Sequence, residues 1–171
     1  MQQTEFKTKL KDGTSILIRQ NDPCMKDCIV QGFDELSAQS RYSRFFVPLK
    51  TLSNAQLKNL TDVDSINRVV VTALEIQEDK NRCIGLARYF RLNEEPDVAE
   101  FALTVIDEFQ KRGVGMILLK ALIDRARENR IRVFRGSVLS SNYQMIRMLK
   151  SHKANFSDEG NGLLCFDFEI D

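Results

Sequence analysis

A strand, a polar turn and a helix follow one another in the middle of the chain, and their residue types point to phosphate binding. Residues 98–106 are nearly all apolar and end in β-branched residues, which predicts a strand. After the turn, Gly113 and Gly115 open an apolar segment that is too long for a strand and predicts a helix. The first N–H groups of a helix lack internal partners, and glycines let a ligand approach them closely. With the charges of Lys111 and Arg112, the sequence predicts a site for phosphate or pyrophosphate.

The spacing of the glycines narrows the choice of phosphate ligand. The Walker A pattern is absent, and the dinucleotide fingerprint would need a glycine at Leu118. Gln110-x-x-Gly113-x-Gly115, directly after an apolar strand, resembles instead the acetyl-CoA motif of the GNAT family of N-acetyltransferases, Gln/Arg-x-x-Gly-x-Gly/Ala. The alternative is two glycines at a helix start that bind nothing. The preceding strand and the following helix favour the binding site.

Composition excludes several classes of protein. The chain has 171 residues, which predicts a single domain over residues 1–171. Its 25 Lys and Arg against 24 Asp and Glu leave a net charge of +1, so nothing indicates a nucleic-acid or membrane partner. No apolar run approaches the roughly 20 residues that cross a bilayer, and the N-terminus is polar, without a signal-peptide core. The four cysteines match no zinc spacing, so we expect no metal, and free thiols fit a cytoplasmic location.

The elements that position the turn form a mixed pattern of strands and helices. Asp12-Gly13 between two β-rich runs predicts a hairpin, and Asn21-Asp22-Pro23 predicts a helix start. A second helix is expected at 53–60, followed by an antiparallel meander of three strands at 65–76, 82–92 and 98–106. The remaining expected elements are a helix at 113–128, a strand at 133–138, a helix from a Ser141–Gln144 capping box to about Lys150, and a strand at 163–170.

This order, ββ-α-α-βββ-α-β-α-β, is that of the GNAT fold, an α+β fold with a mixed, mostly antiparallel central sheet flanked by helices. More closely, the chain resembles the acetyltransferase domain of bacterial Pat-type protein lysine acetyltransferases. The segments that carry this resemblance are Leu36-Ser37, Ser40-Arg41-Tyr42, Arg44-Phe45-Phe46, Gly85-Leu86-Ala87-Arg88-Tyr89, Ala99-Glu100-Phe101-Ala102, Val138-Leu139, Asn142 and Met145. The chain departs from the family at Asn155-Phe156, where many members have Gly-Phe.

The resemblance implies an activity and a set of site residues. The activity is transfer of an acetyl group from acetyl-CoA, as cosubstrate, to a primary amine, most often a protein lysine. Acetyl-CoA is expected where the parallel strands 98–106 and 133–138 splay apart. The residues expected to bind it are Leu103, Thr104, Val105, Gln110, Lys111, Arg112, Gly113, Val114, Gly115 and Asn142. For Asn142 the alternative is plain helix capping.

Glu100 is the candidate general base, because the resemblance gives this role to the glutamate of Ala-Glu-Phe-Ala. It is the one ionisable residue in the predicted strand. Burial there would raise the pKa of a carboxyl group toward the range that is useful for accepting a proton. The alternative is a solvent-facing position on a half-buried strand. No general acid is predicted, since the position where many members have a tyrosine is Leu149.

Charges along the chain fit a cationic acceptor and an anionic cosubstrate. Residues 93–109 contain six acids and no Lys or Arg, whereas residues 111–135 contain eight Lys or Arg and two acids. An ordinary solvated helix face would show the same basic pattern. Two other functions stay open: acetylation of a small amine or polyamine, and a non-catalytic domain that binds acyl-CoA as a sensor.

Overall fold

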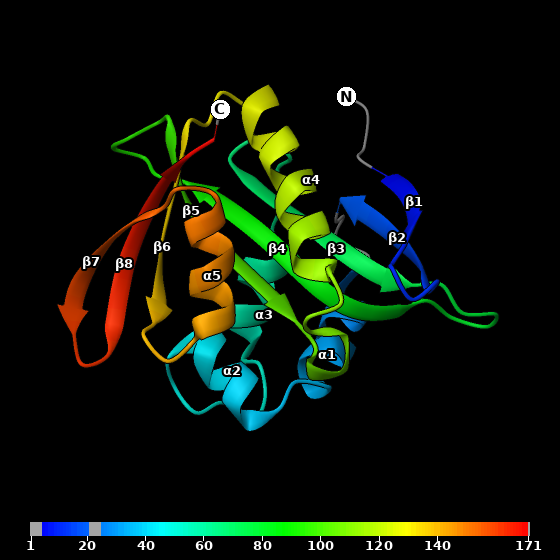
Figure 1. Ribbon diagram of the computed structural model, residues 1–171. Coiled ribbons are helices and arrows are strands. Elements are labelled where there is room, and N and C mark those ends of the chain that lie inside the picture. Colours follow the sequence, from blue (N-terminus) through cyan, green and yellow to red (C-terminus); the bar gives the residue numbers. More distant parts are fainter. Residues whose placement is uncertain (1–4, 21–24, 171) are drawn as a thin grey trace.

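The computed structural model describes residues 5–20 and 25–170, which form one eight-stranded sheet with helices on both faces (Figure 1). The strands are β1 (Glu5–Lys9), β2 (Ser15–Gln20), β3 (Arg68–Glu75), β4 (Arg82–Arg91), β5 (Val98–Val105), β6 (Val133–Leu139), β7 (Asn155–Gly160) and β8 (Leu163–Glu169). Their order in the sheet is β1-β2-β3-β4-β5-β6-β8-β7. The β5–β6 pair is parallel and the other neighbouring pairs are antiparallel. The predicted α+β fold with a mostly antiparallel sheet is confirmed.

The helices divide between the two faces of the sheet. They are α1 (Lys26–Asp34), α2 (Ala38–Phe45), α3 (Asn54–Thr61), α4 (Val114–Glu128) and α5 (Tyr143–Ser151). Alternate residues of β3 show the division, because Val69 and Val71 join the core that contains α4, whereas Val70 packs with Leu57 and Leu60 of α3. A strand covered on both faces reads as a continuous apolar run, which is why Val69-Val70-Val71 shows no alternation. Within the described residues, no helix is long and apolar enough to cross a bilayer.

Two elements were not predicted as they occur. The segment between α1 and α3 contains a helix of its own, α2, which begins after Ser37, whose hydroxyl accepts the Ser40 N–H. The strand β7 pairs with β8 and is mostly exposed, so it has no apolar pattern by which to recognise it. The expected helix start at Asn21-Asp22-Pro23 lies outside the described residues.

The start of α5 corrects a predicted cap. The helix begins at Tyr143, and the side chain of Asn142 accepts the N–H of Met145 at 3.2 Å. The predicted capping box of Ser141 and Gln144 is therefore wrong, because the cap lies one residue later. Asn142 serves as a helix cap, which was the alternative to a cofactor contact for this residue.

The parallel strands β5 and β6 part soon after they meet. They pair at Val98–Val133, Ala99–Phe134 and Glu100–Arg135 and at no later residue. Beyond this point β6 continues in register with β8, while β5 continues with β4. The expected gap between the two parallel strands is confirmed, and Glu100 lies at its start.

Candidate functional site

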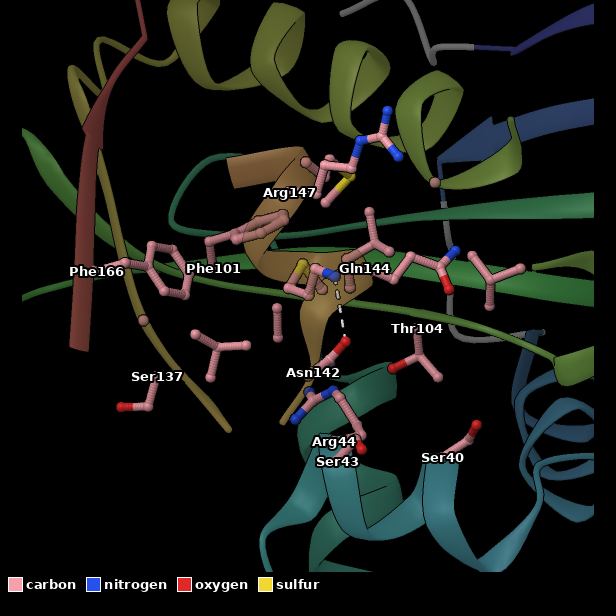
Figure 2. Close-up of a pocket in the computed structure, with 18 of the residues that line it drawn as sticks. Ser40, Ser43, Arg44, Phe101, Thr104, Ser137, Asn142, Gln144, Arg147 and Phe166 are labelled. Carbon is pink, nitrogen blue, oxygen red and sulfur yellow. Dashed lines mark hydrogen bonds between the residues drawn. The ribbon is translucent and has the colours of Figure 1, made fainter. Parts of the chain in front are cut away.

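A cleft of about 1090 Å³ opens where β5 and β6 part (Figure 2). Its walls come from α2, from β5 and the turn after it, from the start of α4, and from β6 and α5. This volume suits a ligand of cofactor size. The predicted site residues that line it are Glu100, Leu103, Thr104, Val105, Gln110, Lys111, Gly113, Gly115 and Asn142.

The turn that leads into α4, residues 107–115, has the geometry of an anion site, and we call it the anion turn. Gly113 caps the helix with a φ of 94°, a left-handed conformation that glycine adopts without strain. The first helical bond from this end runs from the Ile117 N–H to the Gly113 carbonyl, so the earlier amides lie outside the helical ladder. A Cβ added to Gly115 would lie 3.6 Å from Leu103 and 3.8 Å from Met148, which is ordinary van der Waals contact inside the cleft. The backbone here is open to a phosphate group.

Two of the predicted residues direct their side chains elsewhere. Arg112 donates to Asp12 at 2.8 Å and to Thr14 at 2.8 Å, and its guanidinium lies over the Phe109 ring. The Arg112 guanidinium, together with hydrogen bonds from Thr14, holds the pKa of Asp12 well below its usual range. The side chain of Val114 is buried in the core. Arg112 therefore fastens the turn to the β1–β2 hairpin, and only the backbone of these two residues remains available to a ligand.

Gln110 also has a bracing role within the site. Its Nε2 donates to the Val105 carbonyl and to the Ser40 hydroxyl, both at 3.1 Å. These bonds join the turn to the end of β5 and to α2. The glutamine of the motif thus holds the anion turn in place through its side chain.

Asp107 ties the same two walls of the cleft together. Its carboxylate accepts the Ser37 N–H at 2.9 Å, the Ser37 hydroxyl at 2.7 Å and the Ser40 hydroxyl at 2.9 Å. Burial alone would raise the pKa of Asp107, but these hydrogen bonds outweigh it and lower the pKa below its usual value. The charged form of this carboxylate therefore stabilises the native state.

We expect Asp107→Asn to lower the free energy of unfolding at pH 7 by about 1–2 kcal/mol, a value discounted for partial exposure. Because the native pKa is depressed, the wild-type advantage is present above the ordinary aspartate value and is lost as pH falls below about 4. Urea unfolding at pH 7 and at pH 3 measures both effects, with the exposed Asp79→Asn as control. A difference between Asp107→Asn and wild type that does not shrink in acid would contradict this account.

Glu100 faces the open cleft, and its expected burial is wrong. Its side chain is 57% exposed, and its Oε1 lies 4.0 Å from Nη2 of Arg88. The neighbouring Ala99 and Phe101 are buried in the core, whereas the side chain between them points to the opposite face of the sheet. Glu100 is the last residue of β5 that pairs with β6, so the cleft opens beside it. Its carboxylate is thus accessible to a ligand or to solvent.

Two arginines near Glu100 were not among the predicted site residues. Arg88 lies on the same face of the sheet, since Phe90 pairs with Glu100 and Arg88 pairs with Ala102. It is 14% exposed, and burial lowers its pKa while the charge of Glu100 acts the other way. Arg44 of α2 lines the cleft itself. The signal available in the sequence was a charged residue within a buried strand, as at Arg88.

Half of the eight cations in the basic segment at 111–135 pair with carboxylates. Besides Arg112, which pairs with Asp12, Arg125 pairs with Glu128, Arg127 with Asp124, and Arg135 with Glu95 and Asp167. These four charges of the predicted basic rim are thus engaged within the protein. Among the cations of this segment, Lys111 and Arg135 line the cleft.

Comparisons with known proteins agree with this geometry. The sequence profile of the acetyltransferase (GNAT) family matches residues 36–153. An acetyltransferase of Pseudomonas aeruginosa is 33% identical over 123 residues, which are 72% of this chain and 66% of that protein. The acetyltransferase Pat of Mycolicibacterium smegmatis is 26% identical over 167 residues, 98% of this chain and 49% of that protein. The crystal structure of the GNAT domain of S. lividans PAT superposes with a TM-score of 0.86 at 29% identity, covering 96% of each chain.

The chain spans about two thirds and about half of the two curated relatives. The matched region runs from the start of α2 to the end of α5, and so contains β5, the anion turn and β6. These are the elements that form the cleft. The chain therefore belongs to the acetyltransferase (GNAT) family.

Proposed function

We propose that this chain transfers an acetyl group from acetyl-CoA to a primary amine, most often a lysine side chain of a protein, by direct attack. The observation that carries the proposal is that one cleft contains both the open helix start at Gly113–Gly115 and the exposed carboxylate of Glu100. The first fits a pyrophosphate, and the second fits an attacking amine.

The described residues fit CoA along the length of the cleft. Backbone amides at the start of α4 would hold the pyrophosphate, with Lys111 beside them. Residues 103–105 pair with β4 on one side only, since β6 has diverged, so their other edge can bind the pantetheine arm in the manner of a strand, with the Val105 carbonyl also accepting from Gln110. The Asn142 Oδ1 caps α5, which leaves its amide nitrogen as a donor toward the arm.

Glu100 would act on the acceptor rather than on CoA. A lysine amine has an ordinary pKa of about 10.4, so near neutral pH it must lose a proton before it attacks. Glu100 accepts that proton, directly or through water, as the nitrogen bonds to the thioester carbonyl carbon. The carbon–sulfur bond then breaks, and the CoA thiolate takes a proton from solvent. No side chain is assigned as acid, since Leu149 has no ionisable group and Tyr143, although it lines the cleft, is 78% exposed.

The nature of the acceptor rests on the relatives. The resemblance to Pat-type enzymes, together with the likeness to the acetyltransferase Pat and to the GNAT domain of S. lividans PAT, supports a protein lysine. A small amine or polyamine remains the second candidate of the same class. A domain that binds acyl-CoA without turnover is the third.

Release of free thiol from acetyl-CoA, measured with a panel of lysine peptides, polyamines and amino acids, tests the proposal. We expect release that depends on the amine and is fastest with peptides. Faster release with a polyamine would move the assignment to small amines. CoA binding by calorimetry without amine-dependent release would identify a sensor instead.

A further inference from the structure

Arg44 carries a half-buried positive charge with an unused donor. Its Nη2 atom is shielded from solvent and has no hydrogen-bond partner among the described residues. The side chain extends from α2 into the cleft, on the side where Thr104 and Asn142 lie (Figure 2). Arg44 and Thr104 also line a small apolar pocket of about 50 Å³ that adjoins the cleft. A guanidinium in such a place normally has a carboxylate or carbonyl partner.

A neighbouring arginine on the same helix has both of its Nη atoms bonded, although its Nε has no hydrogen-bond partner among the described residues. Arg41 donates from Nη1 to the Lys50 carbonyl at 2.8 Å and from Nη2 to the Asp34 carbonyl at 3.0 Å. These bonds join α2 to the segments on either side, which is a structural role. Arg44 makes no comparable bond from Nη2, although its guanidinium lies over the Phe45 ring at 4.9 Å.

The charges around Arg44 do not fully neutralise its positive charge. Burial, and next the positive charge of Arg88, lower the pKa of Arg44 to about 9, while Glu100 acts in the opposite direction. Glu100 is shared, because it also lies 4.0 Å from Arg88. Arg135 also lines the cleft and pairs in register with Glu100, but its guanidinium is engaged with Glu95 and Asp167. Arg44 and Arg88 therefore share Glu100 as a carboxylate, and an acceptor carboxylate would supply a second one.

We propose, on the basis of the transferase function proposed above, that Arg44 binds a carboxylate of the acceptor. The preferred acceptor is then an amine with a carboxylate nearby, as in a lysine beside an aspartate or glutamate. The ammonium group of such an acceptor pairs with Glu100, and its carboxylate accepts from the part of the Arg44 guanidinium that lines the cleft. A free amino acid has the same chemistry and is the other source of this group.

Matched peptides and matched variants test the proposal. The substrates are a Lys-Asp peptide and the same peptide with Lys-Asn, together with free lysine and lysinamide. The variants are Arg44→Met, Arg44→Lys and, as a control for net charge, Arg127→Met on the exposed side of α4. Thiol release yields kcat and KM for each pair, and thermal unfolding reports the fold.

We expect wild type to favour the Lys-Asp peptide by about tenfold or more in kcat/KM. Arg44→Met should raise KM for that peptide by about 10- to 100-fold, and should leave the Lys-Asn peptide and the KM for acetyl-CoA unchanged. Arg44→Lys should recover part of the preference, because it keeps the charge and loses the guanidinium. Melting temperature should stay equal or rise in Arg44→Met, since a half-buried charge with an unused donor is removed.

Several results would overturn the proposal. Equal rates with both peptides in wild type, together with equal rates on lysine and lysinamide, would show that no carboxylate is recognised. An equal loss of kcat on both peptides in Arg44→Met would indicate that Arg44 acts on the thioester and not on an acceptor carboxylate.

One further result supports the proposal and identifies a free amino acid as the source of the carboxylate. In that case wild type prefers lysine over lysinamide, Arg44→Met abolishes this preference, and the two peptides react equally.

A binding measurement separates this proposal from the proposed function. If wild type turns over no acceptor, the transferase assignment fails, and calorimetry of the CoA complex with the acetylated Lys-Asp and Lys-Asn peptides decides the role of Arg44. Tighter binding of the Lys-Asp form that Arg44→Met abolishes supports a carboxylate site. Equal binding of both forms, or binding of neither, overturns it.

Discussion

Replacing Glu100 by glutamine should lower the rate of acetyl transfer by about a hundred- to ten-thousand-fold, the usual cost of losing a general base. The change keeps the shape of a side chain that is 57% exposed and, among the described residues, makes one ion pair at 4.0 Å, so the fold should be unaffected. CoA affinity should barely change, because the proposed CoA contacts, at residues 103–105, 111–115 and 142, do not include Glu100. Raising the pH should partly rescue the variant, because more of the acceptor amine is already neutral.

A second acid of the same cleft supplies the control. Glu159 lies on β7, is exposed and lines the cleft, and Glu159→Gln makes the same change of charge. We expect its rate to stay within about twofold of wild type. If Glu159→Gln lost rate while Glu100→Gln kept the wild-type rate, the general base would be assigned to Glu159 on β7 instead. A folded Glu100→Gln with wild-type turnover, measured with its melting temperature, would retire the catalytic role of Glu100.

Replacing Gly115 by glutamate should abolish CoA binding while the protein stays folded. A Cβ at this position meets only ordinary contacts, at 3.6 Å from Leu103 and 3.8 Å from Met148, so the backbone tolerates a side chain. The rest of the glutamate then enters the cleft with a negative charge where the pyrophosphate is expected. Calorimetric titration with CoA, together with thermal unfolding, measures both effects.

Two further glycine variants make this test specific. Gly115→Ala adds only the tolerated Cβ, and alanine at this position fits the family motif, so we expect CoA affinity close to wild type. Gly113→Ala has no steric conflict within 4 Å but must adopt a φ of 94°, which costs roughly 1–2 kcal/mol in stability. Unchanged CoA affinity in a folded Gly115→Glu would show that the anion site lies elsewhere.

The walls of the cleft are joined by a few polar side chains. Asp107 and Gln110 come from the turn after β5, and both bond to Ser40 of α2. The same turn is fastened to the β1–β2 hairpin by Arg112. The anion turn and the helix that carries Arg44 are thus held as one unit, which positions the two ends of the proposed reaction relative to each other.

Local signals were sufficient for the elements around the anion turn. The apolar run of β5 and the glycines before α4 predicted a strand, a turn and a helix in this order, because each depends on residues within a few positions. Asp12-Gly13 predicted the first hairpin for the same reason. The element order was sufficient for the fold class and for a parallel strand pair, and the family resemblance added that this pair splays apart.

Elements without an apolar pattern were beyond the reach of such signals. The strand β7 is exposed along most of its length and is defined by its pairing with β8. The helix α2 has no buried residue, and it is held by its Ser37 cap and by Asp107, which lies 70 residues away in the chain. The partner decides the structure in both cases, and a partner distant in sequence leaves no local trace.

By itself, the sequence predicted the fold family and the strand, turn and helix at 98–128, because these depend on residue type and short spacing, and the family resemblance added Glu100 as the candidate base. Only the tertiary structure decided which side chains reach the cleft. It exposed Glu100 where β6 diverges, turned Arg112 toward Asp12, and brought Arg44 to the same cleft from a separate helix. Directions of side chains depend on which face of the sheet is covered and by what, and that is settled only when distant segments pack together.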